Sequence, residues 1–509
     1  MSLSKQSKHK KSRSGKTEET YAAIDLGSNS FHLIVQSISS QGIRTQDRLR
    51  ERVRLGEGIN SCNSLTQHVK DRAVECLKRF CERIRPVKPR NIRAVGTQAL
   101  RKLESDDQLL TEFESHLGCP IEIISGVEEA RLIWLGARSE FTEEHEEVLL
   151  IDIGGGSTEL VSGKGGVSSQ LASLEVGCVQ IMNSFFKGGD LSKNKYQDAK
   201  LAIAIELEPV IKRFKSRPLQ NYFGTSGSIL AISKILGTWE EGRQITLRNL
   251  KEIREKLFSL GNVSEIDLPQ ISMERKKVLP GGVIILEVLM RELKIQSLEA
   301  IPGGLREGIL TDLIGRDEGL DIREQTILSK MKNFGIDESH ALRVSDLAQQ
   351  IYRSTKKPWG IDTLQVANWI RWSALLHEAG LSLGHDSHTR HGEYLIRNSD
   401  MPGFSYTDQK MMSFLVRNQK RKISEQNFFG LGPIQVADQC RLLLIIRLAV
   451  LLNRSRISLS IPLEVSASTN TISLFFDRDW IDERPLTQAL LDREKELFGN
   501  LGLNLDWNS

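Results

Sequence analysis

The first part of the chain alternates between two spacings of apolar residues, one typical of strands and the other of helices. Residues 21–25 form a short apolar run before a polar turn at 27–30, and apolar character returns over 31–38, which predicts a β-hairpin. Apolar residues at helical spacing predict a helix over 65–84. Further predicted elements are strands at 92–95 and 121–124 and a helix at 128–137. Such alternation indicates an α/β domain.

The opening hairpin pattern occurs twice. Residues 22–35 read AAIDLGSNSFHLIV, and residues 148–161 read VLLIDIGGGSTELV. Aligning Asp25 with Asp152 also matches the glycine, the serine and the second apolar run of each copy. A repeat in which each copy opens an α/β segment predicts two related domains that face one another across a cleft. A third glycine-containing turn, 224–228, again follows an apolar strand.

The sequence changes character after about residue 316. Apolar residues keep helical spacing over 325–456, and from 457 strand-like alternation returns before a helix near 486–498. We therefore expect two α/β domains forming a cleft, an all-helical region and a small α+β C-terminal domain. The predicted divisions are a tail at 1–20, α/β domains at 21–136 and 137–315, a helical domain at 316–456 and a terminal domain at 457–509.

Charge is distributed unevenly along the chain. It has 69 Lys and Arg against 65 Asp and Glu, and residues 1–20 alone hold six basic and two acidic groups, so the remainder is neutral overall. A neutral body disfavours a specific nucleic-acid partner. We expect the basic tail to be a solvated arm, with peripheral contact to an anionic membrane surface as the open alternative.

Two further classes of protein are disfavoured by composition. No apolar run approaches the roughly 18–20 residues that a membrane span requires, and no apolar segment follows the N-terminal charges as in a secretory signal. The six cysteines are scattered without paired or metal-binding spacing. They predict reduced thiols and a cytoplasmic protein.

The glycine-containing turns are candidates for phosphate binding. Successive backbone N–H groups exposed by glycine form a concavity that accepts phosphate oxygens, and hydroxyl and amide side chains add donors. A single glycine-containing turn could be an ordinary hairpin turn, but this explanation accounts less well for three such turns. The P-loop alternative fails, because Thr158 stands where its first glycine is required, five positions before Gly163-Lys164. The candidate residues are Gly27, Ser28, Asn29, Ser30, Gly154, Gly155, Gly156, Ser157, Thr225, Ser226, Gly227 and Ser228.

Carboxylates beside these turns suggest a magnesium site. Asp25 and Asp152 end the first strand of each hairpin, and Glu159 could return to the same ion from the second strand. Mg²⁺ prefers oxygen ligands and keeps several waters, so few protein carboxylates are needed.

At this point the motifs resemble a known family. The pair DLGSNS and DIGGGST resembles the two phosphate motifs of the actin, sugar kinase and heat-shock chaperone ATPase superfamily, whose domains are ribonuclease H-like. More narrowly, AAIDLGSNSFHL, RLGEGI, IRAVGTQALR, ISGVEEARLIWLG, GTSGSI and LREGIL are similar to the exopolyphosphatase / guanosine pentaphosphate phosphohydrolase family, in its long four-domain form.

The resemblance implies Mg²⁺-dependent hydrolysis of a terminal phosphoanhydride with release of orthophosphate. A glutamate of the EEAR segment would activate water; Glu128 and Glu129 are the candidates, and Glu129 matches the family's position. Arg93 matches a family arginine and would clamp a phosphate. The resemblance also implies a homodimer.

The helical region resembles a degenerate HD domain. His340 and His377-Glu378 stand where that superfamily has metal ligands, but the segment 447–452 lacks the last aspartate. This departure favours a scaffold role, with the histidines at 385–391 as alternative substrate contacts. Residues 401–460 hold nine basic and three acidic groups, so we expect a track for a long polyanion that includes Arg417, Lys420, Arg421 and Lys422.

Several functions remain open at this point. Exopolyphosphatase acting on inorganic polyphosphate is the first reading, and guanosine pentaphosphate 5′-phosphohydrolase is an alternative that could coexist in one protein. An actin-like nucleotide-binding or kinase module is disfavoured by the EEAR segment. A polyphosphate-binding protein without catalysis is disfavoured because Asp152, Glu159 and Glu129 are all present.

Overall fold

The chain forms two compact units. The computed structural model describes residues 18–39, 42–60, 62–103, 106–140, 147–164, 167–215, 219, 221–237, 244–317, 319–423, 428, 436–456 and 461–508. The first unit comprises residues 1–105, 112–122 and 129–320; the second comprises 106–111, 123–128 and 321–509. Residues 1–17 of the predicted basic tail lie outside the described residues.

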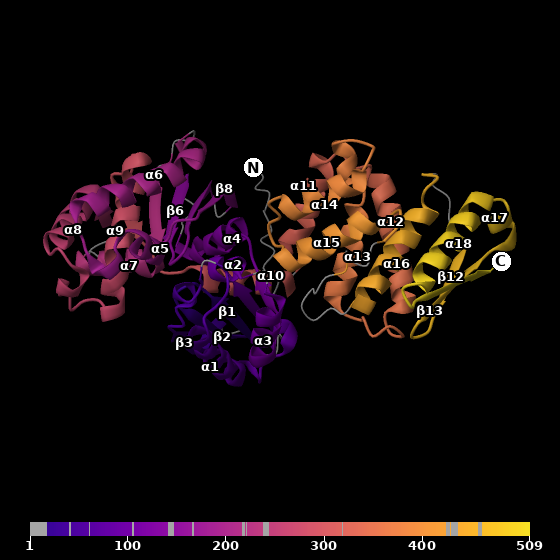
Figure 1. The fold of residues 1–509 in the computed structure, drawn as a ribbon, viewed down its shortest axis with the longest axis horizontal. Helices are drawn as coiled ribbons and strands as arrows, with labels where there is room; N and C mark the ends of the chain where they lie inside the picture. The colour runs from indigo at the N-terminus through magenta and orange to yellow at the C-terminus, as the bar shows by residue number, and fades with distance from the viewer. Residues whose placement is uncertain are drawn as a thin grey trace, which may run out of the picture. The chain divides into compact units, whose positions relative to one another are not determined.

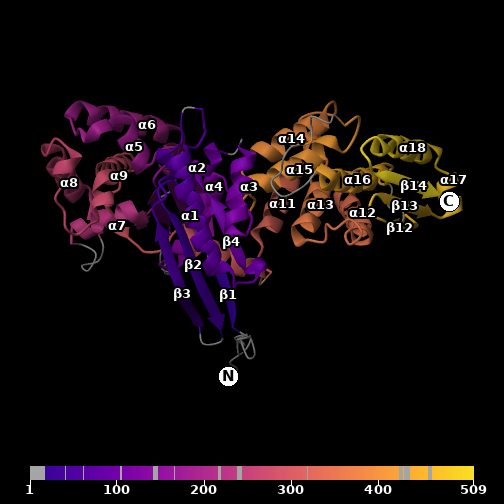
Figure 2. The same cartoon turned by 60° about the horizontal axis from the view of Figure 1, so that its bottom comes forward.

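The first unit opens with a five-stranded mixed sheet of order β3-β2-β1-β4-β5 (Figure 1). Its strands are β1 (Glu19–Leu26), β2 (Phe31–Ser39), β3 (Gly42–Glu51), β4 (Ile92–Gly96) and β5 (Ile121–Ile123). Its helices are α1 (Gln67–Ile84), α2 (Gln98–Lys102) and α3 (Asp107–Leu117). Figure 2 shows β1, β2 and β3 running side by side, with α1 near them. The predicted hairpin and the predicted helix over 65–84 are therefore confirmed.

A second, six-stranded sheet of order β10-β11-β9-β6-β7-β8 completes the α/β part. Its strands are β6 (Val148–Ile153), β7 (Thr158–Lys164), β8 (Val167–Leu174), β9 (Asn221–Thr225), β10 (Gln244–Thr246) and β11 (Ser297–Ala300). The helices packed with it are α5 (Cys178–Phe185), α6 (Lys193–Lys215), α7 (Ser226–Ile235), α8 (Leu247–Ser259) and α9 (Met273–Glu292). Helix α9 is the central one, because it contacts each of the other four.

The two repeated hairpins have the same register. Asp25 of β1 pairs with His32 of β2, and Asp152 of β6 pairs with Glu159 of β7, so each aspartate lies opposite the residue seven positions later. In each copy the first strand also pairs in parallel with the next strand of its sheet, β4 or β9. The sequence repeat therefore corresponds to a structural repeat.

Two helices cross between the sheets of the first unit. Helix α4 (Gly126–Ala137) contributes Ala130 and Trp134 to a core cluster with β6, whereas α10 (Leu305–Asp317) packs on β1. Their crossing requires glycine, because a Cβ on Gly136 would lie 2.0 Å from the Gly304 carbonyl oxygen and one on Gly308 would lie 1.7 Å from that of Leu132. Each helix thus packs against the sheet of the other half of the repeat.

The second unit is a helical bundle joined to a small sheet. Its helices are α11 (Ile322–Asn333), α12 (Glu338–Thr355), α13 (Leu364–Leu375), α14 (His388–Asn398), α15 (Tyr406–Asn418), α16 (Val436–Leu452), α17 (Arg478–Asp482) and α18 (Pro485–Gly499). Strands β12 (Leu463–Ala467), β13 (Thr471–Phe476) and β14 (Asn504–Asn508) form the sheet. One hydrophobic core runs through both parts.

Helix α16 lies at the centre of this core. It is buried nearly all round, and Arg447 in its middle donates two hydrogen bonds of 2.6 Å to the carboxylate of Glu494 on α18. The charge is therefore paired where it interrupts the apolar run.

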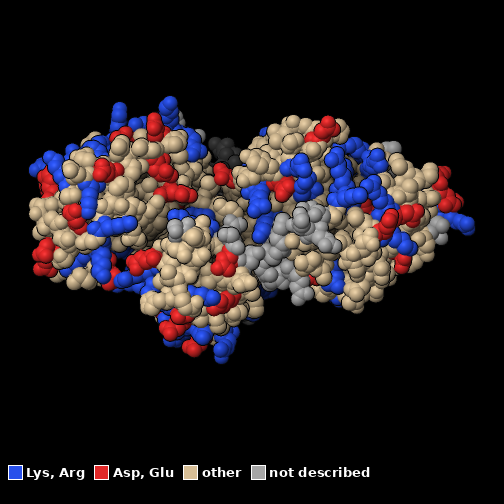
Figure 3. Space-filling model, viewed as in Figure 1, with Lys and Arg blue, Asp and Glu red and all other residues tan. Residues whose placement is uncertain are grey.

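No helix among the described residues is both long and apolar enough to cross a membrane. Figure 3 shows Lys and Arg side chains gathered on the visible face of the second unit.

Candidate active site

A cleft of about 850 Å³ opens in the first unit, and all three glycine-containing turns line it. The predicted phosphate-binding residues found in its lining are Gly27, Ser28, Asn29, Ser30, Gly154, Gly155, Gly156, Ser157, Thr225, Ser226 and Gly227. The predicted metal-binding residues Asp25, Asp152 and Glu159 and the predicted base Glu129 line it too. The cleft thus brings together residues as distant in the sequence as Asp25 and Gly227.

The two repeated turns approach each other closely. A Cβ on Gly155 would lie 3.4 Å from the Cβ of Asn29, and one on Gly156 would lie 3.0 Å from the hydroxyl of Ser28 and 2.2 Å from the amide oxygen of Gln98. A side chain at either glycine would therefore fill the gap between the turns. The absence of these side chains leaves the backbone accessible.

The third turn, unlike the two repeated ones, does not join two strands of a hairpin. Strand β9 leads at Thr225 directly into α7, and Ser226, at φ 95°, accepts hydrogen bonds from the N–H groups of Ser228 and Ile229. Arg275 packs against Gly227, where a Cβ would meet its guanidinium. A helix N-terminus beside an arginine is a favourable place for an anion. Ser228, in contrast, does not line the cleft, and its hydroxyl lies 3.4 Å from the Cys178 sulfur.

Four carboxylates share the cleft: Glu129 and Glu159 are buried, and Asp25 and Asp152 are half-buried. Burial and the neighbouring Glu129 raise the pKa of Asp152 to about 7, and burial, Glu129 and Asp152 raise that of Asp25 to about 7. Burial, with Glu129 and Asp152, also raises the pKa of Glu159 well above its usual range. Mutual repulsion of this kind is relieved by a proton or a cation.

These carboxylates fit a hydrated magnesium ion better than an all-protein cage. The buried Oδ1 atom of Asp25 has no hydrogen-bond partner, which is costly unless a ligand completes it. Among the described residues, however, no three carboxylates of the cleft converge to within 4.8 Å. Mg²⁺ is usually held by one or two carboxylates, waters and substrate phosphates, which agrees with this spacing.

The two candidate glutamates of the EEAR segment have different surroundings. Glu129 reaches the cleft, where its carboxylate accepts a hydrogen bond of 3.0 Å from Arg101. Burial raises the pKa of Glu129, and Arg101 opposes that rise. Glu128, which belongs to the second unit, is not in the lining; its carboxylate accepts a hydrogen bond of 2.7 Å from the N–H of Gly403.

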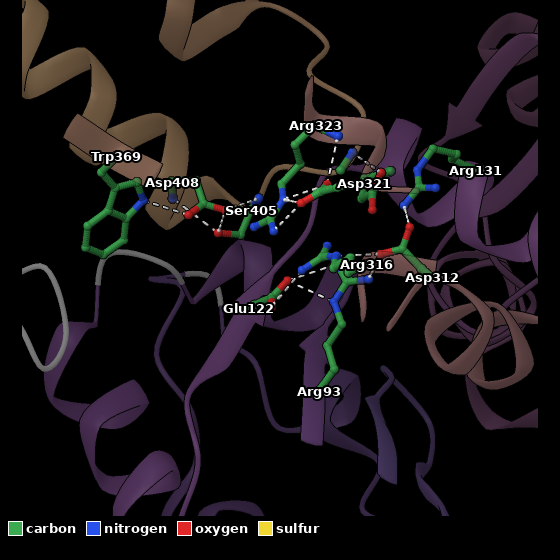
Figure 4. Close-up of polar contacts among 12 residues, drawn as sticks. Arg93, Glu122, Arg131, Asp312, Arg316, Asp321, Arg323, Trp369, Ser405 and Asp408 are labelled. Atoms are coloured by element: carbon green, nitrogen blue, oxygen red, sulfur yellow. Dashed lines mark hydrogen bonds and ion pairs between the residues drawn. The ribbon is translucent and has the colours of Figure 1, made fainter. Parts of the chain in front are cut away.

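Arg93 does not lie in the cleft. It is buried, and its guanidinium donates to Asp312 at 2.7 Å and to Glu122 at 2.9 and 3.1 Å (Figure 4). Arg131 and Arg316 bind the same Asp312, at 2.6 and 2.9 Å. Their positive charges hold the pKa of Asp312 well below its usual range against the opposing effect of burial. Arg93 is therefore part of a buried ion-pair network, because its strand position directs it to α10, and we no longer assign it a phosphate.

Other cations line the cleft instead. Arg48, Arg50, Arg275 and Arg306 are all in its wall. Burial and the nearby Arg275, Arg52 and Arg306 lower the pKa of Arg50 to about 10, which indicates crowding of like charges. Sequence reasoning missed these residues: Arg306 lies within the LREGIL motif, but the strand and helix arginines stand in no motif that singles them out.

Comparison with known proteins identifies the family. Residues 34–317 match the family described as Ppx/GppA phosphatase, and residues 322–495 match Ppx/GppA phosphatase, domain III. The chain belongs to the Ppx/GppA phosphatase family. Its α/β part and the helical domain that follows it are thus those of a Ppx/GppA-type phosphatase.

Solved structures share the fold of this Ppx/GppA member. The Ppx/GppA enzyme of Aquifex aeolicus is 24% identical, with 58% of this chain and 99% of that chain covered and a TM-score of 0.50. An exopolyphosphatase from Cytophaga hutchinsonii is 22% identical, with 60% and 99% covered and a TM-score of 0.54. At these identities the likeness shows the fold alone.

The predicted polyanion track of this Ppx/GppA member carries less unpaired charge than its sequence suggested. Arg417 pairs with Glu393 at 3.1 Å, Arg447 with Glu494, and Arg456 with Asp337 and Glu378. These acidic partners lie outside residues 401–460, so a count over that window could not include them. Lys420, Arg421 and Lys422 are exposed and stay candidates.

Proposed function

We propose that this chain is an exopolyphosphatase, which hydrolyses the terminal phosphoanhydride bond of inorganic polyphosphate and releases orthophosphate. The observation that carries the proposal is the separation of charge within one cleft. Carboxylates crowd at Asp25, Asp152, Glu129 and Glu159, and arginines crowd at Arg50, Arg275 and Arg306. A substrate that is a chain of phosphates with bound cations would relieve both repulsions.

The glycine-rich turns would hold the terminal phosphates. The turns of 27–30 and 154–157 offer backbone N–H groups from opposite walls, and Thr225, Ser226 and Gly227 offer the start of α7. Arg275 and Arg306 would neutralise non-bridging phosphate oxygens. Phosphoryl transfer depends mainly on such positioning and charge neutralisation.

Asp25, Asp152 and Glu159 would hold Mg²⁺, directly or through water. When bound, Mg²⁺ would neutralise charge that develops on the phosphate oxygens. The orphaned Asp25 oxygen and the raised pKa values of these carboxylates support this assignment.

Glu129 would act as the general base. Its carboxylate would accept a proton from a water aligned with the terminal phosphorus, and burial makes it a stronger base than an exposed glutamate. Arg101 would orient the carboxylate through its 3.0 Å hydrogen bond. The proton would then leave with the released orthophosphate.

The test is phosphate release from long polyphosphate, guanosine pentaphosphate and ATP with Mg²⁺. We expect Glu129→Gln, which keeps the shape but not the basicity, to lower kcat by roughly 10²–10⁴-fold. The matched control is Glu128→Gln on the same helix turn, which should retain activity because Glu128 does not line the cleft. Unimpaired hydrolysis by Glu129→Gln would remove the base assignment.

The same assay separates polyphosphate from guanosine pentaphosphate. The family description joins two phosphatase names, Ppx and GppA. The arginine-lined cleft would suit the run of phosphates at the end of either substrate. Transfer of phosphate from ATP to an acceptor in place of water would favour a kinase instead.

A further inference from the structure

The loop that follows β3 is tied to the turn of 27–30. It carries the RLGEGI motif of residues 54–59, none of which lines the cleft. The backbone N–H of Arg54 donates a hydrogen bond of 2.9 Å to the carbonyl oxygen of Asn29, and the N–H of Gly56 donates one of 2.9 Å to that of Ser28. The loop therefore supports the turn from outside the cleft.

These two hydrogen bonds fix the direction of the peptide groups in the turn. In a planar trans peptide, the C=O of one residue and the N–H of the next point in opposite directions. Because the carbonyls of Ser28 and Asn29 point to the loop, the N–H groups of Asn29 and Ser30 point away from it. The loop thus orients these donors toward the cleft, which residues 27–30 line.

A side chain of the same loop reaches helix α9. Arg54 forms an ion pair with Glu274, in the first turn of that helix. The two side chains are 29% and 28% exposed, so solvent screens this pair less than a surface pair. Their other ionic partners, Glu57 for Arg54 at 3.7 Å and Lys277 for Glu274 at 3.5 Å, lie close to them in sequence. The Arg54–Glu274 pair therefore joins elements that are 220 positions apart.

The first turn of α9 is held a second time, and it carries a cation of the cleft. Arg52 donates a hydrogen bond of 3.1 Å to the hydroxyl of Ser272, the N-cap of α9. Arg275 lines the cleft and packs its guanidinium against Gly227 of the third turn. A continuous set of contacts thus runs from the turn of 27–30 through the loop and α9 to the third turn.

The backbone of Arg54 has a conformation that suits glycine better. Its φ angle is 51°, in the left-handed region, where a Cβ crowds the backbone. Residues in such conformations cost free energy and persist where the surrounding structure requires them. Glycine would form the same backbone hydrogen bond at lower cost, so the requirement lies in the Arg54 side chain and its pair with Glu274.

We propose that Arg54 and Glu274 are positioning residues, which hold the N–H groups of the turn of 27–30 and the guanidinium of Arg275 at a fixed spacing. The inference rests on the proposed function, in which both of these groups contact phosphates of one chain. Neither Arg54 nor Glu274 would touch the substrate, because neither lines the cleft. Their pair would instead keep the two phosphate-contacting groups from moving apart.

The test combines amide hydrogen exchange with steady-state kinetics of the full chain carrying Glu274→Gln, which keeps the side-chain shape and removes the charge. Exchange over residues 27–31 should become faster without any substrate, although the substitution is on α9. The KM for polyphosphate with Mg²⁺ should rise at least about tenfold, since a misplacement of about 1 Å can cost roughly 10²-fold. The pH dependence of kcat should not change, because it reports Glu129.

A second variant separates positioning from stability. Arg54→Gly removes the same pair but relieves the left-handed backbone, so its melting temperature should change little while KM rises as in Glu274→Gln. The double variant should be no worse than either single one, because both substitutions remove one shared contact.

The matched control is Glu252→Gln, which breaks an exposed 3.3 Å pair with Arg248 within α8 and should alter neither exchange nor KM. If the unaltered chain releases no orthophosphate from polyphosphate, the proposed function fails, and the exchange measurement still decides whether α9 and the turn are coupled. Unchanged exchange over residues 27–31 in Glu274→Gln would overturn the inference. So would an unchanged KM in an active enzyme, or additive KM increases in the double variant.

Discussion

At the scale of residues, the cleft contains carboxylates that repel one another and that the fold holds close together. Asp152 and Glu159 face each other across one pair of strands, and Asp25 occupies the corresponding position in the other hairpin. In the first hairpin His32 replaces the glutamate, and burial together with Arg306 and Arg50 lowers its pKa so that it is neutral. At this pair of positions the second hairpin therefore carries two carboxylates and the first hairpin carries one.

The carboxylates predict how stability depends on pH and Mg²⁺. Asp25 and Asp152 have pKa values of about 7 in the fold, whereas an unfolded aspartate titrates near about 4. Between these values the folded chain binds more protons, so this contribution to the free energy of unfolding falls as pH rises from about 4 to 7. We expect thermal unfolding without divalent ions to occur at lower temperature at about pH 8 than at about pH 6.

Mg²⁺ should offset this loss of stability at high pH, because it binds the ionised carboxylates. Asp152→Asn should raise the melting temperature at high pH by a few degrees and reduce the effect of Mg²⁺, whereas exposed Asp267→Asn should change neither. A melting temperature of Asp152→Asn that still falls with pH as in the unaltered chain would contradict the account.

At the scale of elements, local patterns predicted the hairpins, since alternating apolar residues and turn glycines act over a few positions. They could not predict which sheet a helix covers. Helices α4 and α10 cross, and each packs against the sheet of the other half, a consequence of the close approach at Gly136 and Gly308. The resemblance, likewise, could not show that Arg93 binds Asp312 of α10, whereas Arg101, eight residues later, reaches Glu129.

The helix crossing can be tested with two substitutions on α10. Gly308→Ala should destabilise the first unit by about 1–3 kcal/mol or more, because its methyl group would overlap the Leu132 carbonyl oxygen. Gly315→Ala is the control: its Cβ would lie 3.9 Å from the nearest atoms, and alanine favours a helix. Denaturant unfolding of both variants measures the difference, and equal stabilities would argue against the crossing.

At the scale of the whole molecule, net charge conceals local charge. The formal +4 equals the charge of residues 1–20, while basic residues at 401–460 are balanced elsewhere. A count along the sequence overstated the unpaired positive charge of residues 401–460, because ion pairs such as Arg447–Glu494 join residues that are distant in the chain. What could be predicted was therefore the presence of basic groups, but not which of them keep their charge exposed.

The exposed pair Arg421 and Lys422 tests the polyanion track. Arg421→Glu with Lys422→Glu should weaken binding of long polyphosphate more than binding of a short chain, because only a long polyanion can contact basic groups outside the cleft. Lys332→Glu with Lys357→Glu, also exposed in the second unit, is the charge-matched control. Equal losses for long and short chains would remove the track hypothesis.

The central claim is that water, activated by Glu129 in the cleft, attacks the terminal phosphate of a polyphosphate chain. Product analysis from a chain of defined length, in ¹⁸O-labelled water with Mg²⁺, tests it most directly. The account predicts that orthophosphate carrying one label and a chain shortened by one phosphate appear in the first turnover, and that Glu129→Gln slows the appearance of both by roughly 10²–10⁴-fold. Internal fragments, unlabelled orthophosphate or undiminished turnover by Glu129→Gln would contradict it.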